Sequence, residues 1–436
     1  MRASPPPPGS PRERGRKLRA HPRFAAAGLG GNHRSVSTNT RTGSLRSAQP
    51  RPRTRATALA FVVAIAGVAA ACDQKEPLPP YKQRLHRGKS SGFDAADASA
   101  AAGPSPAAVL DRVRALLQPL PAQVDNPANP ITDAKRDLGR TLYFDARLSK
   151  NQDLSCNSCH VLASYGIDVR EVDGKRARTS GGHDGQTGAR NSPTVYNAAL
   201  ALSQFWDGRA ADVEAQAGMP ILNPVEMAMP DEATVVRVLK SIPGYRERFE
   251  AAFPGEAEPI TYANMTRAIG AFERKLMTPS RFDAFLKGDL AALEPKELEG
   301  LQLFVDVGCT QCHNGPGLGG AQFQKLGSVK PWPDLTDEGR GAITGNAIDR
   351  FVFRVPLLRN VAQTGPWLHD GSIAELSTMV DKMAEHQAAR GQLTPAENGA
   401  IVAFLGSLTG ELPAADIAAP ELPPSGPDTP KADPSR

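Results

Sequence analysis

The chain has 436 residues, a formal net charge of +5 and 40% hydrophobic residues, which is enough for ordinary buried cores. The positive charge is concentrated in residues 1–72, which hold 13 of the 51 Lys and Arg residues and one of the 46 acidic residues. The remainder therefore carries 38 basic and 45 acidic residues, a net charge of −7. This balance gives no basis for nucleic-acid binding by the folded part.

Residues 1–72 are predicted to be an export leader. Arginines at 51, 53 and 55 precede an apolar run from Ala56 to Ala71 that ends in small residues, as in a secretory signal. The run is too short to span a membrane comfortably. Cys72 stands where a lipoprotein signal has its lipidated cysteine. We expect a periplasmic protein, and two outcomes stay open: a lipid anchor at Cys72, or cleavage after Ala71.

Helical patterns follow a flexible tether at residues 73–105. Apolar spacing and start signals predict helices over 107–117, 132–144, 231–241, 262–277 and around 298–304. The Gly-rich stretch 166–188 is predicted to be a loop. A last helix begins at a capping box formed by Thr394 and Glu397.

These patterns predict a mainly α protein with two units of similar plan. The predicted N-terminal unit covers residues 106–278 and the C-terminal unit covers 279–412. Residues 413–436 are expected to be a loose, Pro-rich tail.

Two C-x-x-C-H motifs carry the chemistry. They are Cys156-Asn157-Ser158-Cys159-His160 and Cys309-Thr310-Gln311-Cys312-His313, and they contain all the cysteines except Cys72. Two cysteines on one turn can form two thioethers to a haem, and the adjacent histidine then faces the iron. A zinc site is the alternative, but a histidine directly after the second cysteine is poorly placed to close a tetrahedron. We therefore predict two covalently bound c-type haems, with His160 and His313 as iron ligands.

The second axial ligand of each iron decides whether a haem carries electrons or reacts. Outside the leader and tether, the remaining histidines are His183, His369 and His386, and methionines are further candidates. His183 lies among glycines, where a loop can approach an iron and also move away. The alternative interpretation of His183 is a surface loop residue.

Several stretches around these motifs resemble the bacterial dihaem cytochrome c peroxidases. The resemblance covers about residues 106–412, and the matching stretches are Leu142-Tyr143-Phe144-Asp145, Arg147-Leu148-Ser149, Gly188-Ala189-Arg190-Asn191-Ser192-Pro193-Thr194-Val195, Gln204-Phe205-Trp206-Asp207-Gly208-Arg209-Ala210, Pro356-Leu357-Leu358-Arg359-Asn360 and His369-Asp370-Gly371.

The resemblance implies a role for each haem. The N-terminal haem is the peroxidatic one, and His183 matches its removable ligand. The C-terminal haem receives electrons, and Met383 matches its methionine ligand, with Met379 one helical turn away as the competing candidate. Without the resemblance, both methionines would be read as the apolar face of a helix.

Further residues match the family in the reaction pocket. Trp206 matches the tryptophan between the haems, although a core tryptophan would look the same. Gln216 and Glu226 match the residues that orient peroxide and move its proton.

The resemblance also implies Ca²⁺ between the domains, a homodimer, and hydrogen peroxide and a small cytochrome c or blue copper protein as partners. The matching calcium ligands are the Asn191 side chain and the carbonyl oxygens of Thr364 and Pro366. No dense acidic loop indicates this site independently.

We therefore predict a peroxidase that reduces hydrogen peroxide to water. One alternative is a protein-oxidising enzyme like those of methylamine utilisation, which use a tyrosine ligand at the C-terminal haem. This chain has no Tyr after Tyr262. The other alternative is a dihaem electron carrier without catalysis.

Overall fold

The computed structural model describes residues 104–388 and 390–435. The predicted leader, with Cys72, and nearly all of the predicted tether 73–105 lie outside the described residues. Within the described part, no helix is long and apolar enough to cross a membrane.

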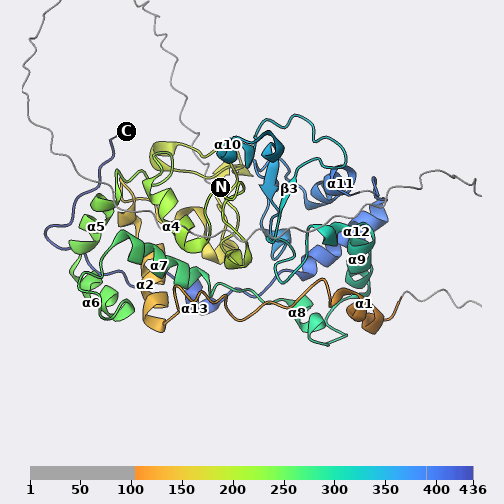
Figure 1. Ribbon diagram of the computed structural model, residues 1–436, viewed down its shortest axis with the longest axis horizontal. Helices are drawn as coiled ribbons and strands as arrows, with labels where there is room; N and C mark the ends of the chain where they lie inside the picture. The colour runs from red at the N-terminus through yellow and green to blue at the C-terminus, as the bar shows by residue number, and fades with distance from the viewer. Residues whose placement is uncertain (1–103, 389, 436) are drawn as a thin grey trace, which may run out of the picture. The chain divides into compact units, whose positions relative to one another are not determined.

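The described chain is mainly α-helical, as predicted, and its helices gather around two separate cores (Figure 1). The first core contains helices of the N-terminal haem unit, which are α2 (Asp133–Tyr143), α4 (Val213–Leu222), α5 (Glu232–Lys240), α6 (Pro243–Ala252) and α7 (Tyr262–Glu273). The second core contains α1 (Pro106–Val113), α8 (Arg281–Leu286), α9 (Pro295–Asp306), α11 (Leu376–His386) and α12 (Pro395–Ser407).

The remaining α-helices and strands are short. They are the helices α3 (Cys156–Cys159), α10 (Gly341–Thr344) and α13 (Ala414–Ile417) and two antiparallel hairpins, β1 (Glu171–Val172) with β2 (Lys175–Arg176) and β3 (Phe323–Lys325) with β4 (Val352–Arg354). The first hairpin lies within the segment 166–188 that was predicted to be a loop.

Both units use the same helix crossing. In the first unit, a Cβ on Gly139 of α2 would lie 2.0 Å from the carbonyl oxygen of Ala268 on α7. In the second, a Cβ on Gly300 of α9 would lie 1.9 Å from the carbonyl oxygen of Ala400 on α12. In each unit, the residue four positions after the glycine and the residue four positions after the alanine are both aromatic, and their rings pack together. The pairs are Tyr143–Phe272, packed edge-on, and Phe304–Phe404, packed at a tilt. The two units therefore repeat one packing plan, and each glycine is required by close backbone approach.

The capping box predicted at Thr394 is confirmed at the start of α12. The Thr394 hydroxyl accepts from the Glu397 N–H, and the Glu397 carboxylate accepts from the Thr394 N–H at 2.8 Å. The predicted position of the first helix differs from the structure. Helix α1, expected in the N-terminal unit, packs in the second core because Val109, Leu110 and Val113 contact its apolar residues.

Thr278 joins the two units. Its hydroxyl accepts hydrogen bonds from the side-chain amides of Asn197 at 2.8 Å and Asn360 at 2.9 Å, and all three residues are fully buried. Because a hydroxyl oxygen has two acceptor sites, one threonine serves both domains.

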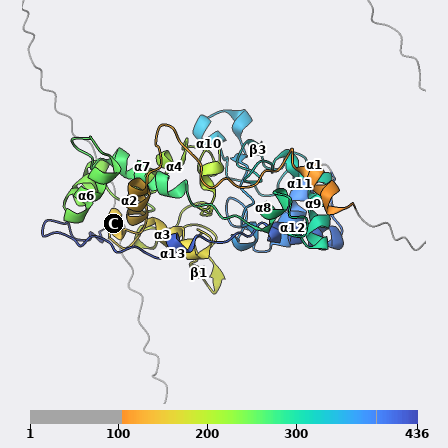
Figure 2. The ribbon, with the colours of Figure 1, turned by 90° about the horizontal axis from the view of Figure 1, so that it is seen from below.

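The predicted Pro-rich tail is held along the N-terminal unit. Pro423 packs against Gly244 of α6, and the Thr429 hydroxyl hydrogen-bonds Ser241 at the end of α5. Figure 2 shows this stretch in dark blue between α13 and α6. The Pro-rich composition of the tail predicts a loose segment, because it does not indicate these hydrogen bonds to residues far away in the sequence.

The helix crossings predict that Gly300→Ala or Gly139→Ala destabilises the protein by about 1–3 kcal/mol, because the new methyl group overlaps a backbone carbonyl. Gly406→Ala is the matched control on α12, since a Cβ there has nothing within 4 Å. It should be neutral or stabilising by up to about 1 kcal/mol. Urea unfolding measures all three, and equal stability of Gly300→Ala and Gly406→Ala would contradict the crossing.

Candidate functional site

The first C-x-x-C-H motif folds as the short helix α3, and His160 follows it as the first residue to leave helical geometry. Its Nδ1 lies 3.3 Å from the carbonyl oxygen of Gly166. A carbonyl oxygen can only accept, so this contact places a proton on Nδ1, and in the neutral imidazole Nε2 then keeps its lone pair for a metal. The Tyr143 hydroxyl donates to the His160 carbonyl at 2.6 Å and holds this turn in place. Burial lowers the pKa of His160 and favours the neutral, ligating form.

The second motif repeats this arrangement. His313 Nδ1 lies 3.1 Å from the carbonyl oxygen of Leu318, which again leaves Nε2 free to bind a metal. Burial lowers the pKa of His313 to about 4. A Cβ on Gly319 would lie 2.1 Å from the Pro356 carbonyl oxygen and 3.2 Å from His313 Nδ1, at a φ of +132°. Glycine is therefore needed for the chain to pass beside the imidazole.

The cysteines of the motifs are unpaired and half-buried. Burial raises the pKa of Cys156, Cys159 and Cys309 to about 12, so these three thiols are protonated at neutral pH and are not poised for redox exchange. Within residues 104–388 and 390–435, no three His, Cys, Asp or Glu side chains converge on one metal position. These environments fit thioether attachment of haem and argue against the zinc alternative.

The first motif opens into a cavity of about 1030 Å³. Its wall contains Cys156, Cys159 and His160 together with Gln216 and Glu226, which the resemblance matches to the reaction pocket. Burial raises the pKa of the Glu226 carboxyl, while the positive charge of Arg209 opposes the shift. The cavity therefore combines a haem attachment motif with a carboxyl group whose proton affinity is increased.

Sequence reasoning did not assign roles to Arg209 and Glu273, which line the same cavity. The Arg209 guanidinium lies 3.4 Å above the centre of the Phe205 ring and pairs with Asp207 at 2.9 Å. Burial raises the pKa of Glu273 to about 8, with the charge of Glu214 as a second cause. Arg209 lies in the stretch Gln204–Ala210 that resembles the family, so the sequence offered a signal for it. The burial of Glu273 depends on tertiary packing and has no such signal.

His183 is buried but does not line this cavity. Its loop is packed against the Glu226 segment. The backbone N–H of His183 donates to the backbone carbonyl of Glu226 at 2.7 Å. A Cβ on Gly182 would lie 1.8 Å from the Val225 carbonyl oxygen. The loop is thus fixed beside the cavity while the imidazole points elsewhere.

A second, smaller cavity of about 230 Å³ adjoins the second motif. Its wall contains Cys309, Cys312 and His313, and both Met379 and Met383 from α11. Among the described residues that line it there is no Asp or Glu. The two cavities therefore differ in chemistry, since only the first offers carboxyl groups and only the second is lined by methionines of α11.

Trp206 lies on the wall of both cavities. Its indole N–H donates to the carbonyl of Asn191 at 3.0 Å. His369 is on the same shared wall, stacked on Phe353 with 4.4 Å between ring centres. His386 lines neither cavity, and its Nδ1 faces the carbonyl of Lys330 at 3.1 Å.

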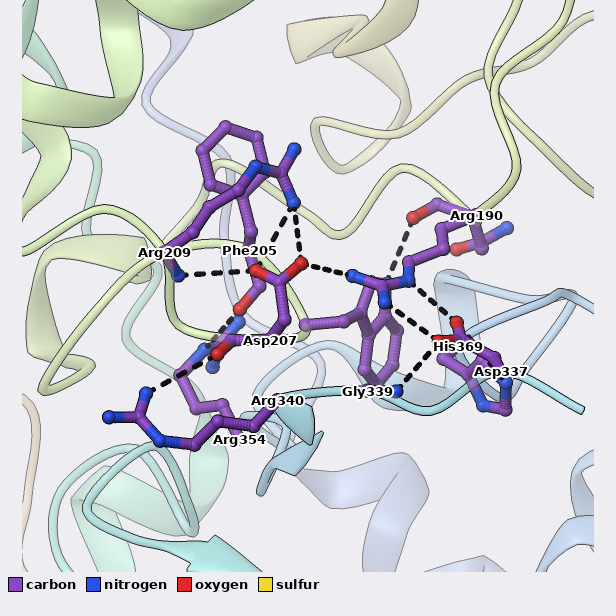
Figure 3. Close-up of polar contacts among 11 residues, drawn as sticks. Arg190, Phe205, Asp207, Arg209, Asp337, Gly339, Arg340, Arg354 and His369 are labelled. Carbon is purple, nitrogen blue, oxygen red and sulfur yellow. Dashed lines mark hydrogen bonds and ion pairs between the residues drawn. The ribbon is translucent and has the colours of Figure 1, made fainter. Parts of the chain in front are cut away.

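Arg190 links the segments that build this wall (Figure 3). It donates to both carboxylate oxygens of Asp337, at 2.7 and 2.8 Å, and to Asp207 at 2.5 Å. Burial acts to raise the pKa of Asp337, but the hydrogen bonds from Arg190 and from the Gly339 N–H dominate and lower it. The N-terminal loop around Trp206 is thereby tied to a loop of the C-terminal unit.

The three residues matched to calcium ligands are also brought together. Asn191, Thr364 and Pro366 all line the second cavity. The Asn191 side-chain amide donates to the carbonyl of Arg178 at 3.0 Å, which leaves its Oδ1 as a potential ligand.

Residues 133–291 match the family described as di-haem cytochrome c peroxidase. The chain is 45% identical to the cytochrome c551 peroxidase of Nitrosomonas europaea over 316 residues, 72% of this chain and 91% of that protein. It is 44% identical to the cytochrome c551 peroxidase of Pseudomonas aeruginosa over 331 residues, covering 74% and 92%. The crystal structure of a MauG-like protein associated with microbial copper homeostasis superimposes with a TM-score of 0.61 at 30% identity, covering 69% of this chain and 97% of that one.

The buried Glu273 predicts a specific pH dependence of stability. Its carboxyl stays protonated in the folded protein up to pH about 8, whereas in the unfolded chain it ionises above its ordinary pKa of 4.5. The unfolded state therefore binds fewer protons between these values, and stability falls as the pH rises through them. In Glu273→Gln, the loss of stability between pH 5 and pH 8 should be smaller by at least about 1 kcal/mol.

Chemical denaturation at the two pH values measures this difference. Glu247→Gln is the control, because Glu247 is exposed on α6. An unchanged pH dependence in Glu273→Gln would show that the carboxyl is already ionised in the folded protein.

Proposed function

Because the chain belongs to the di-haem cytochrome c peroxidase family, we propose that it reduces hydrogen peroxide to water with electrons from a small cytochrome c or blue copper protein. The observation that carries the proposal is the difference between the two cavities. Gln216 and the half-buried Glu226 accompany the first haem motif, whereas Met379 and Met383 of α11 accompany the second.

The residues of the first cavity suit peroxide reduction. Haem, when bound through Cys156, Cys159 and His160, supplies the iron and the electrons for cleavage of the O–O bond. Glu226 takes the proton from one peroxide oxygen and returns it to the other, and its raised pKa favours this double role. The Gln216 amide orients the peroxide. Arg209 lies close enough to influence the charge of Glu226.

His183 is proposed as the removable iron ligand of the first haem. Its loop is packed against Glu226 through the His183 N–H and through Gly182, so a shift of the loop would also reach the acid–base residue. A two-position histidine can close the cavity in one state and admit peroxide in the other.

The second haem, held by Cys309, Cys312 and His313, is proposed as the electron entry point. Met383 is its proposed sixth ligand, with Met379 as the competitor on the same face of α11. A thioether ligand raises the reduction potential of a haem relative to a second histidine. Trp206, on the wall shared by both cavities, shortens the gap that electrons must cross.

Three further features are proposed from the same resemblance. Ca²⁺ would bind Asn191, Thr364 and Pro366 beside the second cavity. The mature protein would work in the periplasm, with Cys72 as a candidate lipid anchor, and would form a homodimer.

The alternatives are less well supported. A protein-oxidising enzyme would need a tyrosine ligand at the second haem, and residues after Tyr262 include no tyrosine. An electron carrier would have no use for the carboxyl and amide pair of the first cavity.

Stopped-flow spectroscopy of the half-reduced protein tests the proposal. One-electron reduction should produce a high-spin signal from the first haem, and that species should consume peroxide within the mixing experiment. A protein that stays low-spin and leaves peroxide unchanged would be an electron carrier.

Glu226→Gln should lower kcat for peroxide reduction by about 10²–10⁴-fold, because the amide cannot carry the proton between the two oxygens. The visible spectra of both haems should remain those of the wild type. Glu247→Gln serves as the control. Retention of more than a tenth of the wild-type kcat by Glu226→Gln would assign the proton transfer to another group.

A further inference from the structure

Residues 423–435 form a strap across the N-terminal haem unit, and the strap leads to His183. Gln152 donates to the Pro430 carbonyl at 2.7 Å, and Arg147 donates to the Ser425 hydroxyl at 3.0 Å. Figures 1 and 2 show the strap, in dark blue, following α6 beyond α13. These anchors belong to the same unit as the first cavity.

Lys150 makes the closest connection between the strap and this cavity. The backbone N–H of Lys150 donates to the backbone carbonyl of Met227, the residue after Glu226, at 2.9 Å. Its carbonyl accepts from the Asp433 N–H at 2.9 Å, and its Nζ donates to the Ser435 carbonyl at 2.6 Å. Lys150 therefore fixes the Ser435 carbonyl in relation to the Glu226 segment.

The same Ser435 carbonyl faces His183. It lies 3.2 Å from His183 Nε2, and the imidazole is 4% exposed. Because a carbonyl only accepts, this contact requires the proton on Nε2. His183 Nδ1 is buried and has no hydrogen-bond partner. The imidazole is thus held through one nitrogen only.

We infer that the strap is a positioning element that holds His183 in its detached position, with Lys150 as the residue that places the Ser435 carbonyl. The inference rests on the proposed role of His183 as the removable ligand. A histidine that binds iron through Nε2 must present a lone pair there, whereas the Ser435 contact requires an N–H at the same atom. Strap contact and ligation through Nε2 therefore exclude each other.

The strength of the contact suits a reversible switch. A single intramolecular hydrogen bond shifts an equilibrium by a modest factor, about five-fold at its typical strength. The strap would therefore bias the position of His183 towards an open first cavity without fixing it there.

The test compares Lys150→Met with the wild type and with Lys240→Met, an exposed lysine of the same unit that pairs with Glu258. Electron paramagnetic resonance of the half-reduced protein measures the ratio of high-spin to low-spin signal from the first haem. Lys150→Met should lower this ratio about five-fold, and deletion of residues 423–436 should lower it at least as much. Lys240→Met should match the wild type.

A second pair of variants tests whether the strap acts through His183. The first haem of the His183→Gly variant should be high-spin. Adding Lys150→Met to this variant should leave the ratio of high-spin to low-spin signal unchanged, because the ligand that the strap restrains is gone. An unchanged ratio in both Lys150→Met and the deletion would overturn the strap, as would a Lys150 effect that persists in His183→Gly. If the wild type itself forms no high-spin signal on half-reduction, the proposed role of His183 fails instead.

Discussion

The Arg190 guanidinium connects two carboxylates from different parts of the chain, Asp207 beside Trp206 and Asp337 in the C-terminal unit. Removing one partner from such a cluster of paired charges destabilises the fold, because the remaining partners keep their charges without compensation. The shared wall between the cavities depends on this connection. Trp206 directly precedes Asp207, so the connection holds the segment that carries the tryptophan shared by both cavities.

Around this wall, one packing plan supports two different chemistries. The glycine–alanine helix crossings and the Nδ1-to-carbonyl contacts of His160 and His313 are the same in both units. The differences lie in the segments that complete each cavity. In the first unit these segments bring Glu226 and the His183 loop, and in the second they bring α11 with its methionines. A repeated frame with unequal loops therefore gives the two proposed haem sites different surroundings.

Local sequence signals predicted the elements whose causes are local. The C-x-x-C-H spacing, the capping box at Thr394, the start signal of α2 at Thr132 and the apolar period of α5 and α7 are set within a few residues. Helix α4 was missed because it contains Pro220 and its apolar residues are not confined to one face. The packing of α1 in the second core and the Arg190–Asp337 pair depend on residues far away in sequence. Gln216 and Glu226 were found by resemblance, and only the fold explains why they share a cavity.

The two proposed haem sites are unequal in ligation, and we therefore expect them to differ in reduction potential. A potentiometric titration followed by electron paramagnetic resonance tests this directly. We predict two separate one-electron steps, with the haem at Cys309 and Cys312 reduced first and Met383→His lowering only that higher potential. A single step in which both haems are reduced together, unaffected by Met383→His or Met379→His, would contradict unequal ligation of the two haems.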